Sequence, residues 1–188
     1  MELLTKSQTL QRKEEIIEEI KKGKIFIYPT DTVYGLGCNA LLPDSIKKLR
    51  TIKNRDARPF SIIAPNKDWI IKNCEIDEFA KKWLNRIPGK YTLIMKLKNK
   101  ECISSETNNY MDSIGVRIPD NWFSKILAET DIPFITTSVN LQGDSPMTSL
   151  GDVNEKIKES VDYLIYQGEK KGKPSAIINT ITQEIMRR

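Results

Sequence analysis

The sequence contains no histidine among its 188 residues. This absence excludes a Ser-His-Asp or Cys-His catalytic apparatus, and it excludes a metal site of the HExxH type. Any chemistry must rest on Lys, Arg, Asp, Glu, Ser, Thr or Tyr side chains, or on a metal carried in by the substrate. Such residues favour charge neutralisation and the positioning of reactants over proton shuttling.

Cysteine is scarce, and long apolar runs are missing. Cys38, Cys74 and Cys102 are odd in number and widely spaced, which indicates neither a disulfide framework nor a zinc site. No apolar run approaches the roughly 20 residues that a membrane-spanning helix needs. The N-terminal stretch is rich in charged residues from Lys6 onwards and lacks a signal-peptide pattern. We therefore expect a cytoplasmic protein with no membrane partner.

The composition is that of a globular protein, with 39% hydrophobic and 29% charged residues. The length suits a single domain over residues 1–188 with a sizeable core. Lys and Arg number 30 against 25 Asp and Glu, a net charge of +5. This surplus suits an anionic ligand or RNA, but a bias in genome composition would produce the same surplus, so the charge alone does not decide.

Apolar periodicity predicts strands and helices that alternate, which is typical of an α/β layer architecture. Helices are expected over 8–22, from Pro43 onwards, and over 66–73, 76–86, 122–130 and about 151–159. Strands are expected over 24–28, 60–64, 91–97, 114–118, 132–139 and 161–166, with a last strand pair in 176–186. Residues 30–39 are rich in Gly and Thr and are expected to form a structured loop.

The stretch YPTDTVYGLGCNA at 28–40 is the first candidate for a ligand-binding segment, because a Gly-containing loop after a strand can direct N–H groups and hydroxyls at a ligand. Gly35, Gly37 and Ala40 match the loose dinucleotide-binding pattern G-x-G-x-x-A. Six residues separate Tyr28 from Gly35, however, and the next clear helix starts only at Pro43. We interpret this match as accidental, and an unrelated nucleotide-binding protein is disfavoured.

Two further candidate segments place charged or hydroxyl-bearing residues at the end of an expected helix or strand. Lys53, Arg55 and Arg58 are three cations within six residues at the end of an expected helix. They could form a polyphosphate clamp, although cations at a helix C-terminus are common without any ligand. The run TTSVN at 136–140 follows an apolar strand, where α/β sheets bind ligands. An ordinary Ser/Thr/Asn turn would have the same composition.

The joint order of the segments is more specific than any one of them. The segments are YPTDTVYGLG at 28–37, the K-x-R of Lys53 and Arg55, PGKYT at 88–92, GVRIP at 115–119, TTSVN at 136–140 and KPSAII at 173–178. With them the chain resembles the YrdC-like threonylcarbamoyl-AMP synthases from about residue 10 to residue 187. The resemblance implies an α/β fold with a twisted mixed sheet, flanking helices and a concave basic cleft.

The resemblance also implies roles for individual residues. The K-x-R and S-x-N pairs correspond to catalytic residues, which here are Lys53, Arg55, Ser138 and Asn140. The positions matched to threonine binding are Thr32, Arg117, Ser138 and Ser175. The positions matched to ATP binding are Lys53, Arg55, Asn140, Thr148 and Arg187, and no protein metal site is implied.

The implied reaction is that of a nucleotidyltransferase, which forms threonylcarbamoyl-AMP and pyrophosphate from L-threonine, bicarbonate and ATP for the threonylcarbamoyladenosine modification of tRNA. Mg²⁺ would be delivered with ATP, because this ion is usually bound through substrate phosphates rather than by a protein cage. RNA or tRNA and a downstream tRNA threonylcarbamoyl transferase machinery are the other implied partners. The alternative is a non-catalytic, YciO-like module that binds RNA on a basic concave surface.

Overall fold

The computed structural model describes residues 1–55, 58–141 and 143–186. The strands are β1 (Glu2–Thr5), β2 (Phe26–Pro29), β3 (Tyr34–Gly37), β4 (Ser61–Ile63), β5 (Tyr91–Lys96), β6 (Ser113–Arg117), β7 (Phe134–Ser138), β8 (Tyr163–Tyr166), β9 (Ala176–Asn179) and β10 (Glu184–Met186). The α-helices are α1 (Lys6–Gln11), α2 (Lys13–Lys21), α3 (Pro43–Lys53), α4 (Lys67–Asn73), α5 (Glu78–Leu84), α6 (Ser105–Asn108), α7 (Trp122–Glu129) and α8 (Glu155–Ser160). Two short 3₁₀ helices are η1 (Lys100–Cys102) and η2 (Leu150–Asp152).

The helices begin and end where local chemistry allows. Pro43 occupies the first turn of α3, and Asn54 ends that helix in the left-handed conformation with φ 47°. The side chains of Asp77 and Asn121 accept hydrogen bonds from the first turns of α5 and α7. None of the described helices has the length and apolar run needed to cross a bilayer.

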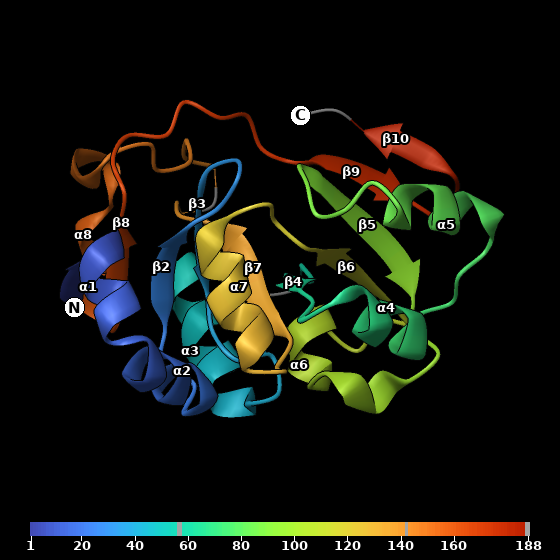
Figure 1. The fold of residues 1–188 in the computed structure, drawn as a ribbon, viewed down its shortest axis with the longest axis horizontal. Helices are drawn as coiled ribbons and strands as arrows, with labels where there is room; N and C mark the ends of the chain where they lie inside the picture. Colours follow the sequence, from blue (N-terminus) through green and yellow to red (C-terminus); the bar gives the residue numbers. More distant parts are fainter. Residues whose placement is uncertain (56–57, 142, 187–188) are drawn as a thin grey trace.

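The strands form one ten-stranded mixed sheet in the order β1-β8-β2-β3-β7-β4-β6-β5-β9-β10. The centre is antiparallel, because β2, β3, β7 and β4 pair in that way in succession. Parallel pairs flank it, with β8 on β2 and β6 on β4. The first and last strands lie at opposite edges of the sheet, with β1 at one and β10 at the other (Figure 1).

The two faces of the sheet carry two separate hydrophobic cores. Successive strand residues alternate between them, so that Ile27 packs on one face and Phe26 on the other. Helices α3, α4, α5 and α8 contribute to the larger core, and α2 and α7 to the smaller one. Figure 1 shows α7 lying across β7 on the side that faces the viewer. The α/β architecture with a mixed sheet and flanking helices is therefore confirmed.

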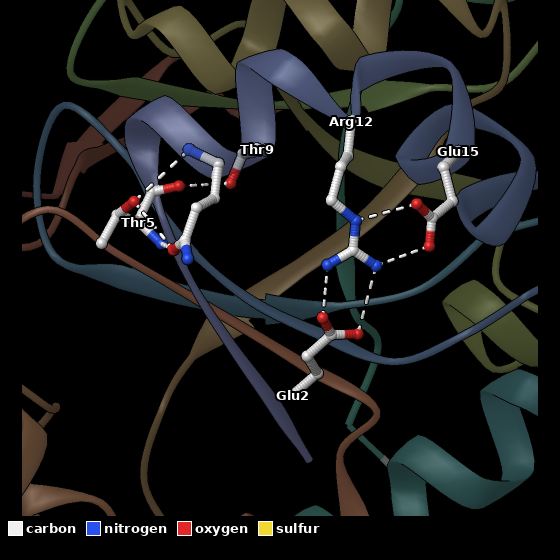
Figure 2. A network of polar contacts seen from close by, with 6 residues as sticks. Glu2, Thr5, Thr9, Arg12 and Glu15 are labelled. Carbon is white, nitrogen blue, oxygen red and sulfur yellow. Dashed lines mark hydrogen bonds and ion pairs between the residues drawn. The ribbon is translucent and has the colours of Figure 1, made fainter.

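The edge strand β1 was not expected from the sequence. A polar network connects it to the helices that follow (Figure 2). Thr5 caps α1 in a capping box with Gln8, and the Thr9 hydroxyl donates back to the carbonyl of Thr5. The Arg12 guanidinium pairs with the carboxylates of both Glu2 and Glu15. Arg12 also separates α1 from α2, so the single helix expected over 8–22 is wrong.

A second correction concerns residues 30–39, which were expected to form a loop. Tyr34–Gly37 is β3, a buried strand paired with β2 and β7. Glycine disfavours strands in isolation, but a Cβ on Gly37 would lie 1.7 Å from the carbonyl oxygen of Ile135, so the close approach of β7 requires a residue without a side chain. Because both Gly35 and Gly37 lie within this strand, the interpretation of G-x-G-x-x-A as accidental is confirmed.

Candidate active site

A pocket of about 410 Å³ opens on the sheet face that carries the smaller core. Its floor comes from strand residues of that face, namely Ser61, Thr92, Arg117, Thr136, Ser138 and Ile177. Several of these strand positions hold small hydroxyl-bearing residues instead of the large apolar residues that α7 covers further along the sheet. The alternation of strand side chains therefore aims several hydroxyl groups and one guanidinium into the same space.

The charged groups of the pocket lining are mainly cationic. Arg55, Arg58 and Arg117 line it, and Asp144 is the carboxylate that the described residues contribute. An arginine binds carboxylate and phosphate oxygens through a planar fork of N–H donors. The lining therefore suits a ligand that carries several negative charges and that also has groups able to form hydrogen bonds with hydroxyl side chains.

Arg117 is a buried cation at the end of β6. Its side chain is 7% exposed, and its NH2 group pairs at 2.5 Å with Asp31, whose side chain is 6% exposed. NH1 lies 3.5 Å from the hydroxyl of Thr32, while Nε is buried with no hydrogen-bond partner among the described residues. Burial lowers the pKa of Arg117, and Asp31 opposes that shift. A buried donor without a partner is costly, so Arg117 has hydrogen-bonding capacity that the described residues leave unused.

Lys53 stands apart from the arginines, because its ammonium is directed into the protein. The residue is 4% exposed, and Nζ donates to the carbonyl of Ser138 at 2.8 Å, to Asn140 Oδ1 at 2.8 Å and to the carbonyl of Asn140. These three acceptors match the three donors of an ammonium. Burial, reinforced by the charge of Arg55, lowers the pKa of Lys53 to about 8.

The S-x-N segment turns sharply at the end of β7. The Ser138 hydroxyl donates to Asn140 Oδ1 at 2.6 Å, so both polar side chains lie on one side, whereas Val139 is buried in the larger core. Asn140 Nδ2 donates to the carbonyl of Asp144 at 2.7 Å. Both Ser138 and Asn140 line the pocket.

Arg55 follows α3 and is held against the ring of Phe60, with its guanidinium carbon 5.1 Å from the ring centroid. It donates to the carbonyl of Pro59 at 2.7 Å and approaches the Thr137 hydroxyl at 3.4 Å. Arg50 stacks on the same ring at 4.7 Å and donates to the carbonyl of Glu106. Aromatic stacking and backbone acceptors thus hold Arg55 at the pocket wall.

The segment between β8 and β9 arches along the top of the view in Figure 1 and reaches the pocket. Lys170 anchors it twice, since its backbone N–H donates to the carbonyl of Thr148 and its ammonium to the carbonyl of Thr30. At Gly172 a Cβ would lie 2.2 Å from the carbonyl oxygen of Thr32, so the two backbones are in direct contact. The Ser175 hydroxyl then lies 2.8 Å from that of Thr92 inside the pocket.

The structure brings together most of the residues singled out in the sequence. Those that line the pocket are Thr32, Arg55, Arg117, Ser138, Asn140 and Ser175. Lys53 lies behind the wall, and Thr148 bonds Asp152 through its backbone N–H and its hydroxyl instead of lining the pocket. Arg187 lies outside the described residues.

Sequence reasoning missed Asp31, Thr92 and Asp144 as site residues, whereas Arg58 was one of the three cations expected in the polyphosphate clamp. Thr92 and Asp31 stand within quoted motifs, PGKYT and YPTDTVYGLG, which was the available signal. Asp144 lies in a polar stretch, and only the folded chain shows that it reaches the same pocket.

Comparison with known proteins gives one consistent family. The family model named for Sua5, YciO and YrdC, with the description telomere recombination, matches residues 18–188. A Methanocaldococcus jannaschii protein, provisionally named a threonylcarbamoyl-AMP synthase, is 35% identical over 94% of this chain and 86% of its own length. The threonylcarbamoyl-AMP synthase of Vibrio campbellii is 29% identical over 93% of this chain and 97% of its own length.

Among solved structures, that of P. abyssi Sua5 complexed with L-threonine superposes with a TM-score of 0.86 at 26% identity. The match covers 98% of this chain but 55% of the Sua5 chain, so this protein spans about half the length of that relative.

Proposed function

This chain belongs to the Sua5/YciO/YrdC family, and from that premise we propose that it is an L-threonylcarbamoyladenylate synthase. The observation that carries the proposal is the convergence of Thr32, Arg55, Arg117, Ser138, Asn140 and Ser175 on one pocket, although they come from distant parts of the sequence. Relatives aligned over nearly their whole length carry that enzyme name, and a solved relative binds L-threonine. The substrates are L-threonine, bicarbonate and ATP.

The floor of the pocket suits threonine. The carboxylate of an amino acid is the natural partner of Arg117, which is desolvated and whose Nε has no hydrogen-bond partner among the described residues. Thr32 lies beside this guanidinium, and Ser175 and Thr92 form a hydroxyl pair on the same floor. These groups can bond the carboxylate, amine and hydroxyl of the substrate.

The wall formed by Arg55 and the S-x-N turn suits the phosphates. Arg55 and Arg58 supply two guanidiniums, while Ser138 and Asn140 supply neutral polar groups nearby. Lys53 contributes indirectly, because its ammonium holds the carbonyls of Ser138 and Asn140. Thr148 and Arg187 remain proposed ATP contacts from the family resemblance alone.

The chemistry fits a site without histidine. The threonine amine forms a bond to the carbon of bicarbonate-derived carbon dioxide and loses a proton to solvent, which gives a carbamate. A carbamate oxygen then bonds to the α-phosphorus of ATP, and the bond to the bridging oxygen breaks so that pyrophosphate leaves. The main barrier is the approach of anions, and fixed guanidiniums lower it by electrostatic stabilisation.

The donor set of the pocket is compatible with Mg²⁺ that arrives on ATP. No group of three or more Cys, Asp or Glu residues suited to a metal occurs in the described part of the chain, and Asp144 with neighbouring hydroxyls would supply the few protein ligands such an ion needs. Bound Mg²⁺ would neutralise phosphate charge. Contact with tRNA, a downstream threonylcarbamoyl transferase and a cytoplasmic location belong to the proposal on the same family grounds.

The decisive experiment measures pyrophosphate release from ATP with threonine and bicarbonate present or omitted singly. We expect release only when both are present, with a product that links AMP to threonine. Serine should be a poor substrate, since loss of a packed methyl group costs about 1–3 kcal/mol. Binding of RNA that weakens steeply with salt, without any pyrophosphate release, would instead favour the YciO-like binding module.

A further inference from the structure

Asp31 connects three parts of the pocket although it does not line it. Its Oδ1 pairs with Arg117 NH2 at 2.5 Å, and its Oδ2 accepts a hydrogen bond from the backbone N–H of Asp120 at 3.1 Å. It therefore joins the turn after β2 to the end of β6 and the approach to α7. Both oxygens of this buried carboxylate are used within the protein.

The contacts of Asp31 leave Arg117 in a defined state. One terminal nitrogen pairs with Asp31 and the other lies 3.5 Å from the Thr32 hydroxyl, while Nε is buried and finds no acceptor in the part of the chain that the structure describes. The guanidinium is held by its neighbours, because Asp31 pairs with one terminal nitrogen and the Thr32 hydroxyl lies beside the other. Lys170, a second cation that feels the charge of Asp31, donates a hydrogen bond to the carbonyl of Thr30.

We infer that Asp31 is a positioning residue for threonine recognition, which holds the Arg117 guanidinium so that its remaining donors meet the substrate carboxylate. The inference rests on the proposed function for the identity of the carboxylate. Asp31 acts through Arg117 and does not itself contact substrate. A cation fixed before binding recognises its anion without the entropy loss of ordering a long side chain.

The test compares Asp31→Asn, Asp31→Glu, Arg117→Lys and the double variant Asp31→Asn/Arg117→Lys. Asp31→Asn is expected to raise the KM for threonine about tenfold or more, while the KM for ATP changes by less than about twofold. In the Arg117→Lys background the same change should add less than about twofold, because residues that act as one unit are not additive. KM does not depend on the fraction of enzyme that is folded.

Asp162→Asn is the matched control. Asp162 also accepts a backbone N–H, that of Ile25, and it lies near the cations Lys24 and Lys48 away from the pocket. Its variant is expected to shift the melting temperature without changing the KM for threonine. Equal rises in both KM values for Asp31→Asn, or full additivity with Arg117→Lys, would overturn the inference.

A second measurement does not depend on turnover. The ¹⁵N resonance of Arg117 Nε, assigned by its loss in Arg117→Lys, is expected to be visible at neutral pH, to move on addition of L-threonine, and to be lost in Asp31→Asn. An unchanged resonance in Asp31→Asn would contradict the positioning role. If the substitution abolishes the resonance but threonine does not move it, Asp31 still positions Arg117 and the proposed substrate is wrong.

Discussion

The ammonium of Lys53 lies 2.8 Å from Asn140 Oδ1, so the first residue of the K-x-R element holds the last residue of the S-x-N element from inside the protein. The same ammonium donates to the carbonyls of Ser138 and Asn140. Two motifs about 85 residues apart are thus one structural unit, in which Arg55 and Ser138 face the pocket and Lys53 fixes their separation.

Replacement of Lys53 tests this unit. Lys53→Met leaves the three acceptors without their donor, and we expect the free energy of unfolding at pH 7 to fall by about 1–3 kcal/mol. Activity should fall through misplacement of the S-x-N turn. Urea denaturation measures the loss of stability, and pyrophosphate release measures the loss of activity. A variant with unchanged stability and a large rise in the KM for ATP would instead assign Lys53 to direct phosphate binding.

The titration of Lys53 predicts a pH dependence of stability. Its pKa is about 8 in the folded protein, below the ordinary value of 10.5, so the unfolded chain binds an additional proton between these pH values. The free energy of unfolding must then rise with pH from 8 to 10.5, by at most roughly 1.4 kcal/mol per pH unit. The stability difference between the wild type and Lys53→Met isolates this contribution from other lysines. A stability difference that does not change between pH 8 and 10.5 would contradict the lowered pKa of Lys53.

Arg55→Ala should reduce kcat/KM for ATP by about one to three decades, because a fixed guanidinium in a partly enclosed site stabilises developing phosphate charge. Loss of the Phe60 contact and the bond to Pro59 should cost only about 1–2 kcal/mol of stability. Arg55→Lys should recover little activity, since an ammonium lacks the fork.

Arg58→Ala is the control for Arg55, because this side chain lines the same pocket but is exposed. Its loss should have a smaller effect, because solvent screens an exposed charge. Equal effects of the two alanine variants would indicate that total charge, and not the placement of Arg55, governs the rate.

The turn after β7 predicts opposite outcomes for neighbouring residues. Ser138→Ala and Asn140→Ala should each weaken ATP or threonine binding, with a coupling of about 0.5–3 kcal/mol in a double-mutant cycle. Val139→Asp should unfold the protein, because it places an unpaired carboxylate in the larger core. Thermal melts with and without threonine plus ATP separate the two classes. Tolerance of Val139→Asp would overturn the placement of this turn.

Gly37→Ala tests the close approach of β3 and β7. The added Cβ would lie 1.7 Å from the carbonyl oxygen of Ile135, and two paired backbones must separate to admit it, so we expect a loss of about 3 kcal/mol or more. Gly151→Ala is the control, since the nearest atom to its Cβ would be 3.8 Å away. Similar melting temperatures for the two variants would contradict the strand pairing.

The sequence by itself determined most of the elements and six of the residues that line the pocket. Apolar periodicity located α3, α4, α7 and the strands from β4 to β10 to within a few residues, because each element must bury one face. The motif order indicated Thr32, Arg55, Arg117, Ser138, Asn140 and Ser175 as site residues, and all six line one pocket.

Only the tertiary structure decided which strands pair and which distant side chains come into contact. β1 and β3 gain their hydrogen bonds from β8, β2 and β7, so neither short segment shows a strand pattern by itself. The inward direction of Lys53 and the partnership of Asp31 with Arg117 likewise depend on residues about 85 positions away in the chain. The sequence identifies which residues are cations. Whether a cation is exposed, and which residue it contacts, depends on the strands that the fold brings together.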